Sequence, residues 1–249
     1  MNFEFLDLPQ RTAKPRQTGI TSVYDILSLG QLKILLEDFH PYIDLAKLGM
    51  GTSYITPRLK DKLALYREFG IKVQTGGTLF EKFFSQNKLD ELKRFLERTG
   101  IEYVEISNGS VDITLEERVA LIQDFKKDFK VITEIGSKDV DHVMAPSIWV
   151  REMKTLIEEG CEYVITEGRA SGTAGIYRKS GEIREGLIDE IKREIPIEKV
   201  IFEAPKPSMQ MFFINLIGSN VNLGNVLVKD VLLLESQRLG LRSETFDVQ

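Results

Sequence analysis

The sequence predicts a single-domain (β/α)8 TIM barrel, an α/β fold, and three observations carry this prediction. About eight strand-then-helix units follow one another in strict alternation, which requires a parallel sheet with helical crossovers. The length of 249 residues, 42% of them hydrophobic, suits one such barrel. No GxGxxG follows the first predicted strand and no P-loop is present, so a dinucleotide- or nucleotide-binding sheet lacks its main evidence.

We expect the barrel to occupy residues 16–249, after an N-terminal arm, residues 1–15, that has no hydrophobic periodicity. In the first half, β-formers that run into glycines or a loop predict strands at residues 19–23, 42–53, 72–77 and 103–107. Helical spacing predicts helices at residues 29–39, 57–69, from 78 onward, 89–99 and from 114 to about 128. Sequence patterns mark three of the helix starts: Thr56 before Pro57, Thr78 with Glu81, and Thr114 with Glu117.

The second half repeats the alternation. Strands are predicted at residues 131–136, 164–168 and 200–205, and within 220–226. Helices are predicted at residues 147–159, 186–194, 208–217 and 229–239. Between them lies a Gly/Ser-rich loop at residues 169–182, and loops of that length in compact α/β units are usually functional or mobile.

Charge and cysteine content exclude several classes of protein. The formal net charge is −5, so we expect no nucleic-acid partner. Cys161 is the single cysteine, which excludes an intrachain disulfide and a Cys-rich metal site and suits a reducing compartment. We find neither a signal-peptide pattern nor an apolar stretch of membrane-spanning length, and we therefore expect a cytoplasmic protein without a membrane partner.

Several predicted strands end in a glutamate beside a glycine, a proline or a loop. The four carboxylates are Glu105, Glu134, Glu167 and Glu203. In a barrel, the carboxyl ends of the strands meet at the face where the chemistry occurs, so these side chains should gather around one cavity. Oxygen ligands of this kind suit Mg²⁺. The alternative is a structural polar layer in which the glutamates pair with basic side chains.

Lys138 is the most interesting basic residue, because it follows a strand end just after Gly136. An ammonium there could donate a proton, hold an anion or form a Schiff base, with Glu134 keeping it protonated. The alternative is a solvated loop lysine. Lys47 lies on the predicted strand 42–53 and is a second candidate.

The segment NVNLGNV, residues 220–226, is the predicted phosphate-binding element. Barrels often hold phosphate with the loops after their last two strands. Gly224 would permit close approach of the backbone, while Asn222 and Asn225 would donate hydrogen bonds. The alternative is a plain turn rich in Asn and Gly.

Eight segments together resemble one family, the phosphosulfolactate synthases of coenzyme M biosynthesis. They are KPRQTGITSVYD, IDLAKLGMGTS, VQTGGTLFEKF, EISNG, EIGSK, ITEGRASG, IFEAP and NVNLGNV. The resemblance runs from about residue 14 to residue 242. It implies a (β/α)8 barrel, a homo-oligomer, and Mg²⁺-dependent addition of sulfite to phosphoenolpyruvate, which gives (2R)-phospho-3-sulfolactate.

The resemblance also implies roles for residues. The family's acid is thought to be the lysine after the fifth strand, which here is Lys138, with Glu134 beside it. Arg16, Lys47 and Arg169 are the candidates for the anionic groups of the substrates. Two alternatives stay open: a non-catalytic barrel like the family's plant heat-stress-associated relatives, and an aldolase-like lyase that uses Lys138 or Lys47 as a Schiff base.

Overall fold

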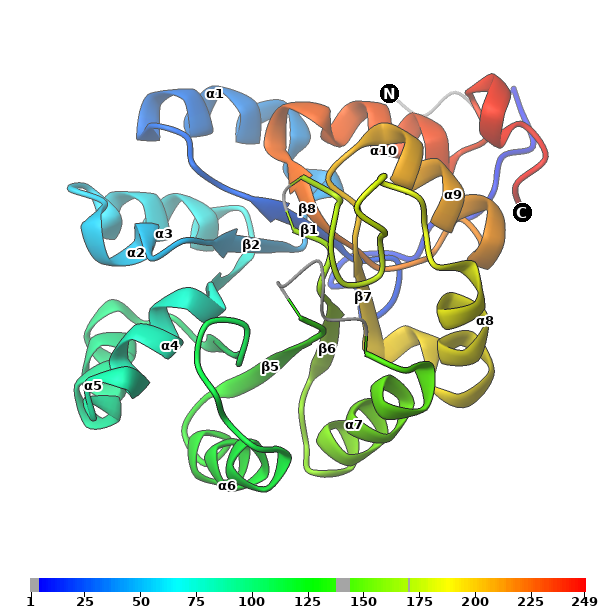
Figure 1. Cartoon of the computed structure of the whole chain (residues 1–249). Coiled ribbons are helices and arrows are strands. Elements are labelled where there is room, and N and C mark those ends of the chain that lie inside the picture. Colours follow the sequence, from blue (N-terminus) through cyan, green and yellow to red (C-terminus); the bar gives the residue numbers. More distant parts are fainter. Residues whose placement is uncertain (1–4, 138–143, 170) are drawn as a thin grey trace.

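The computed structural model describes residues 5–137, 144–169 and 171–249. Within these residues, eight parallel strands form a closed barrel in which the strands follow one another in sequence order. Helices surround the barrel, as Figure 1 shows. The predicted (β/α)8 fold is confirmed. None of the helices in the described ranges is both long and apolar enough to cross a membrane.

The strands are short and lie where the alternation predicted them. They are β1 (Thr21–Tyr24), β2 (Leu45–Leu48), β3 (Lys72–Thr75), β4 (Tyr103–Ile106), β5 (Lys130–Ile135), β6 (Tyr163–Thr166), β7 (Val200–Glu203) and β8 (Leu223–Leu227). The barrel closes where β1 pairs with β8, with Thr21 opposite Leu223.

The helices form the outer layer. They are α1 (Leu29–Phe39), α2 (Thr52–Ile55), α3 (Leu59–Glu68), α4 (Gly77–Ser85), α5 (Leu89–Thr99), α6 (Leu115–Phe125), α7 (Pro146–Glu158), α8 (Glu185–Glu194), α9 (Pro207–Ile217) and α10 (Val231–Arg238). The capping box predicted at Thr114 is present.

Two other predicted helix starts are wrong. Thr56 precedes a proline and is extended, because that position disfavours the helical conformation. Its hydroxyl donates to Thr52 O at the end of α2, and the next helix, α3, begins only at Leu59. Similarly, α4 begins at Gly77 without a side-chain cap, and Glu81 instead accepts a hydrogen bond from the backbone N–H of Ser110.

The barrel interior is divided into an apolar part and a polar part. The apolar part is a small buried cluster that includes Leu45, Ile132, Tyr163, Ile165 and Ile201. Because side chains alternate along a strand, the next interior residue on these strands lies closer to the carboxyl ends. In β2, β5 and β7 that residue is charged, so a polar layer lies on the apolar one.

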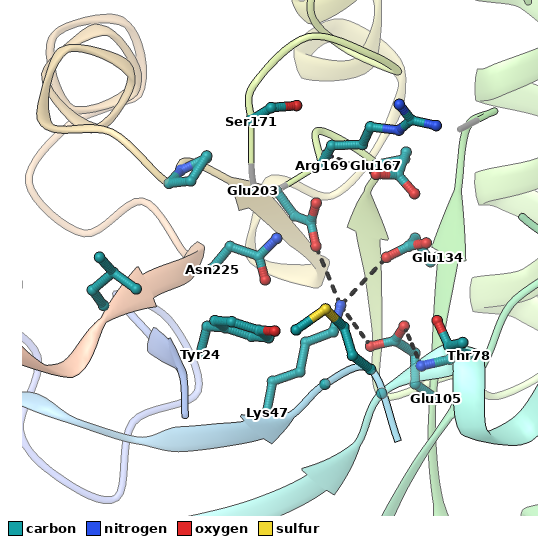
Figure 2. Close-up of a pocket in the computed structure, with 16 residues that line it drawn as sticks. Tyr24, Lys47, Thr78, Glu105, Glu134, Glu167, Arg169, Ser171, Glu203 and Asn225 are labelled. Atoms are coloured by element: carbon teal, nitrogen blue, oxygen red, sulfur yellow. Dashed lines mark hydrogen bonds and ion pairs between the residues drawn. The ribbon is translucent and has the colours of Figure 1, made fainter. Parts of the chain in front are cut away.

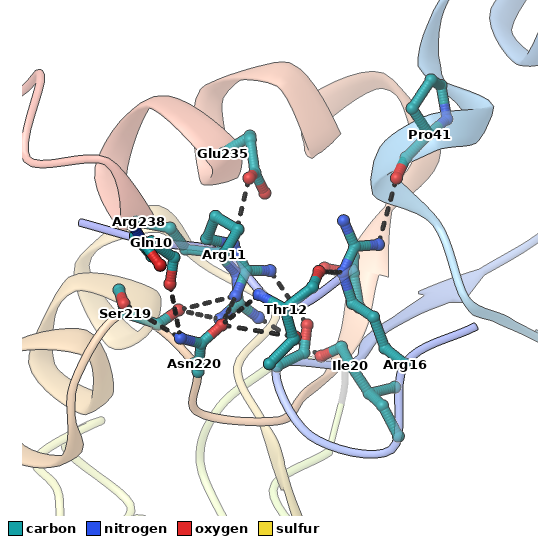
Figure 3. Close-up of polar contacts among 12 residues, drawn as sticks. Gln10, Arg11, Thr12, Arg16, Ile20, Pro41, Ser219, Asn220, Glu235 and Arg238 are labelled. Carbon is teal, nitrogen blue, oxygen red and sulfur yellow. Dashed lines mark hydrogen bonds and ion pairs between the residues drawn. The ribbon is translucent and has the colours of Figure 1, made fainter. Parts of the chain in front are cut away.

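The N-terminal arm closes the opposite end of the barrel, where the strands begin (Figure 3). Arg11 donates from Nη2 to Gly19 O at 2.9 Å and pairs through Nε with Glu235 at 3.0 Å. Beside it, the buried Arg238 donates to the carbonyls of Ser219, Val221 and Ile20 at 2.7, 2.7 and 3.2 Å. Guanidinium groups thus satisfy the backbone carbonyls that precede β1 and β8.

Replacement of Arg238 by methionine tests this closure. Arg238→Met removes the donor of Val221 O and one of two donors of Ser219 O and Ile20 O, which keep Arg11 and the Leu223 N–H. We therefore expect the free energy of unfolding to fall by about 3 kcal/mol. The control is Arg242→Met, which removes a surface ion pair with Glu244 and should change stability by less than about 0.5 kcal/mol. Urea denaturation measures both, and equal effects would contradict the structural role of Arg238.

Candidate active site

Polar side chains converge at the carboxyl-terminal end of the barrel interior. Among the described residues, they are Tyr24 of β1, Lys47 of β2, Gln74 of β3, Glu105 of β4, Glu134 of β5, Glu167 just after β6, Glu203 of β7 and Asn225 of β8. The strand register explains this, since Tyr24 lies opposite Lys47 and Lys47 opposite Gln74. One polar residue from each strand therefore enters the same space.

A pocket of about 500 Å³ opens above this layer (Figure 2). The lining includes Tyr24, Lys47, Gly49, Met50, Gly77, Thr78, Glu105, Glu134, Glu167, Arg169, Glu203 and Asn225. The predicted gathering of the four glutamates around one cavity is thus what the structure contains. Ligand pockets of barrel enzymes lie at this face.

Lys47 stands at the centre of the carboxylates. Its Nζ lies 3.0 Å from Glu105 Oε2, 3.2 Å from Glu203 Oε1 and 3.4 Å from Glu134 Oε2. An ammonium has three N–H donors, and three acceptors surround this one. Burial alone would lower the pKa of Lys47, but the carboxylates, Glu105 foremost, outweigh it and raise the pKa well above its usual value. Lys47 is therefore a permanent cation.

Glu105 is held by protein groups on both oxygens. Oε1 accepts from the Gly77 N–H at 2.8 Å and from Ser107 Oγ at 3.1 Å. Oε2 accepts from Gln74 Nε2 at 3.0 Å, in addition to its contact with Lys47. A side chain at Gly77 would collide, because its Cβ would lie 2.1 Å from Ser107 Oγ. For Glu105, this geometry favours the structural polar layer over metal ligation.

The pKa of Glu203 depends on its burial and on the charges around it. Its Oε2 accepts from the Gly168 N–H at 2.9 Å. Burial raises the pKa of Glu203, Lys47 lowers it, and the neighbouring Glu134 and Glu105 raise it again, with a result of about 7. One proton is therefore readily held on this side of the pocket near neutral pH.

The rim of the pocket contains strained backbone. Met50, Arg169 and Asn225 have φ angles of 50°, 56° and 56°, and they are three of the four non-glycine residues with positive φ in the described ranges. Such conformations cost about 1–3 kcal/mol each and cluster at functional sites. At Arg169 the backbone N–H donates to Glu167 Oε1 at 2.7 Å, and the exposed side chain lies at the pocket rim.

The long loop at residues 169–182 is fastened to the barrel at several points. The Tyr177 hydroxyl donates to Glu203 O at 2.5 Å. Just past the loop, Arg184 donates from Nη2 to Met144 O at 2.8 Å, which ties this segment to the chain before α7. Ile176 and Tyr177 of the loop thus lie against the β6 and β7 side of the pocket.

Two predicted substrate-binding residues lie at the wrong end of the barrel. Arg16 donates to Thr12 O at 2.8 Å and pairs with Asp44, which precedes β2, at 3.1 Å. Asn222 precedes β8, where it accepts from the Ile20 N–H at 3.0 Å and donates to Val200 O at 3.1 Å. Both side chains join the starts of strands together, so the prediction that they contact substrate in this pocket is corrected.

The remaining predicted site residues do not all line the pocket. Asn225 lines the pocket, whereas Gly224 lies within β8 opposite Glu203 and does not line the pocket. Lys138 lies outside the described residues. Tyr24 was missed, although it ends its strand two residues after Ser22 and alternation places it on the interior face.

Comparisons with known proteins find the same family over almost the whole chain. A family model for (2R)-phospho-3-sulfolactate synthase (ComA) matches residues 9–244. The phosphosulfolactate synthase of Bacillus subtilis is 44% identical over 250 residues, 99% of this chain and 99% of that protein. That of Methanocaldococcus jannaschii is 42% identical over 240 residues, 92% of this chain and 94% of its own.

Two further similarities are more distant. The Arabidopsis thaliana protein HEAT-STRESS-ASSOCIATED 32 is 21% identical over 270 residues, 95% of this chain and 92% of that protein. The solved structure of 3-keto-L-gulonate-6-phosphate decarboxylase from Vibrio cholerae has a TM-score of 0.55 at 10% identity, covering 88% of this chain and 96% of that one. At that identity, the likeness shows the fold alone.

The barrel and its carboxylate-lined pocket define an α/β-barrel enzyme whose site lies at the carboxyl ends of the strands. The family match spans almost the entire chain, and the two synthases exceed 40% identity with it. The chain belongs to the (2R)-phospho-3-sulfolactate synthase family.

The raised pKa of Glu203 predicts how stability depends on pH. The folded state binds the extra proton between the ordinary value of 4.5 and the folded value of about 7, so stability falls as pH rises through this window. We expect Glu203→Gln to reduce that decline by on the order of 2 kcal/mol in metal-free protein.

Urea denaturation at about pH 5 and about pH 8 measures the decline. Glu244→Gln is the control, because the pKa of this exposed carboxyl is lowered to about 2 by Arg242 and it stays ionised throughout the window. Parallel pH profiles of Glu203→Gln and the wild type would refute the assignment.

Proposed function

We propose that this protein catalyses the Mg²⁺-dependent addition of sulfite to phosphoenolpyruvate, which gives (2R)-phospho-3-sulfolactate. The near-complete match to the synthase family carries the proposal. The pocket supports it, because it combines a carboxylate cluster with a rim arginine at the catalytic face of the barrel. In the reaction, the sulfur lone pair forms the bond to the methylene carbon and the double-bond electrons move toward the carboxylate. A proton then adds to the central carbon.

The donor atoms of the pocket fit a magnesium ion. Mg²⁺ is usually held by one or two carboxylates together with water and substrate oxygens rather than by a closed protein cage. Consistent with that, no cluster of three His, Cys, Asp or Glu side chains suited to a metal occurs among the residues the structure describes. Glu134 and Glu167, from the neighbouring strand ends of β5 and β6, are the ligands we propose.

Bound Mg²⁺ would supply positive charge against the negative charge that develops on the substrate carboxylate. The protein's own residues bind and orient the reactants. Arg169 is the cation at the rim, and within the described ranges no ion pair engages it, so we assign it to an anionic group of the substrate. Asn225 contributes an amide in the same pocket. The ammonium of Lys47 already faces three carboxylates. We therefore propose that Lys47 holds those carboxylates in place and does not bind substrate.

We propose Lys138 as the acid that protonates the central carbon. Its position three residues after the end of β5 and its match to the family's lysine support this role. A carboxylate near an amine keeps the amine protonated, and Glu134 is the nearest glutamate in sequence.

The assembly and location of the protein are further proposals. Met50, Tyr54 and Ile55 are apolar side chains with 67%, 61% and 74% exposure, close together in sequence near the rim. Exposed apolar groups of this kind suit a subunit contact, and we propose a homo-oligomer. A solution mass of 28.4 kDa, that of one chain, would contradict it.

We also propose that the protein is cytoplasmic, because its cysteine, Cys161, is buried and forms no disulfide, which suits a reducing compartment.

Removal of the metal tests the proposed reaction directly. Purified protein with phosphoenolpyruvate, sulfite and Mg²⁺ should form phosphosulfolactate, detected by mass spectrometry. After treatment with EDTA the rate should fall at least about a hundredfold and return when Mg²⁺ is added. Glu134→Gln and Glu167→Gln should each raise the Mg²⁺ concentration needed for half-maximal rate. Full activity without metal would return the glutamates to a structural role.

The same experiment separates the alternatives. No product from well-folded protein would favour a non-catalytic role like that suggested by the name of the Arabidopsis relative. Covalent trapping of a carbonyl substrate by borohydride on Lys47 or Lys138 would favour an aldolase-like lyase.

Two substitutions at Lys138 separate a proton donor from a simple positive charge. Lys138→Ala should lower kcat by about a hundred- to ten-thousandfold. Lys138→Arg should not restore the rate, because guanidinium keeps its charge and gives up a proton very poorly. Steady-state kinetics measures both variants. If the arginine variant recovers most of the rate, Lys138 only holds negative charge.

A further inference from the structure

Tyr24 presents a hydroxyl to the pocket from a side that the carboxylates do not reach. It is the last residue of β1 and lines the pocket, and Figure 2 shows its ring reaching inward between Asn225 and Lys47. Within the described residues, the hydroxyl makes no hydrogen bond to the protein. A polar group that lines a ligand pocket without a protein partner is available to the ligand.

The backbone fixes the place of the ring. A side chain at Gly49 would put its Cβ 2.5 Å from Cε2 and 3.2 Å from Cδ2 of Tyr24, so the ring lies directly against this glycine. Because Gly49 follows β2 at once, the position of the hydroxyl depends on the junction of β1 and β2. The tyrosine is thus held in place by packing alone.

Charge divides the pocket into two sides. Glutamates come from β4 to β7, whereas β8 and β1 contribute the neutral Asn225 and Tyr24. All three contacts of the Lys47 ammonium point to the glutamates. An anionic oxygen of a substrate is repelled by the acidic side and meets neutral hydrogen-bond donors on the β8–β1 side.

The phenol stays a donor under working conditions. Burial raises the pKa of Tyr24, and the nearby Lys47 lowers it only in part. A protonated hydroxyl can donate to an anion without placing another charge in the pocket.

We propose that the Tyr24 hydroxyl is a substrate-contacting group, which donates a hydrogen bond to an anionic oxygen of the bound substrate on the β8–β1 side of the pocket. The inference rests on the proposed function, and it names the side of the pocket where the anion binds. The shared chemistry is an oxyanion, which either sulfite or phosphoenolpyruvate can supply.

Tyr24→Phe removes the hydroxyl and keeps the ring that packs on Gly49. A hydrogen bond to a charged acceptor is worth roughly ten- to hundredfold in affinity, so we expect a loss of that size in kcat/KM at an unchanged melting temperature. Tyr42→Phe is the matched control, because Tyr42 lies outside the pocket lining and packs against the apolar core. Gly49→Ala provides a second variant, since it displaces the ring and leaves the hydroxyl present.

Calorimetric titration in Mg²⁺ identifies the oxyanion. Sulfite and phosphoenolpyruvate are titrated separately into wild type and Tyr24→Phe, and weaker binding of one ligand to the variant identifies which one the hydroxyl contacts. The proposal for Tyr24 is overturned if Tyr24→Phe binds both ligands as tightly as the wild type does, or if its kcat and KM are unchanged. Absence of product from wild type that binds both ligands overturns the proposed function instead, so the two failures are distinguishable.

Discussion

The contact between the Lys47 ammonium and three carboxylates is the interaction on which the site depends. Ionised groups inside a barrel cost several kcal/mol each unless partners compensate them. Here one cation from β2 compensates Glu105, Glu134 and Glu203, which come from three other strands. Each of these three carboxylates therefore contacts a cation where the polar layer lies on the apolar cluster below it. The same contact fixes where the carboxylates point, so that the stability of the barrel and the geometry of the pocket have one physical cause.

Close backbone approach supports this arrangement on the β2–β3 side. A Cβ at Gly76 would lie 2.7 Å from the Cα of Gly49, and a Cβ at Gly49 would enter the ring of Tyr24. Larger side chains would push the two strand ends apart and move the floor of the pocket. Glycines at these strand ends therefore serve close packing rather than a turn, since neither Gly49 nor Gly76 has a positive φ.

The sequence predicted those parts of the structure that depend on spacing within one segment. A strand that ends in a glutamate places it on the interior face by alternation, and parallel strands bring Glu134, Glu167 and Glu203 to one cavity. The spacing of residues within one segment does not determine where its strand begins. Asn222 was expected at the carboxyl end of the last strand, within residues 220–226, but its hydrogen bonds to Ile20 and Val200, which are distant in sequence, hold it before β8. Arg16 was a candidate from the family resemblance, and its ion pair with Asp44, which precedes β2, holds it at the opposite end of the barrel.

The charges of the pocket lead to one last consequence. Four carboxylates line it, while Lys47 and Arg169 are the cations among the described lining residues. Lys47 is committed to the carboxylates, so an anionic substrate that enters alone meets an excess of negative charge. A divalent cation that enters with the substrate reverses the sign of that interaction, because it can share oxygen ligands from both the carboxylates and the substrate. Under the proposed function, such a cation would make the acidic pocket compatible with an anionic substrate. Under the same proposal, the neutral side formed by Tyr24 and Asn225 would set the orientation of the bound substrate.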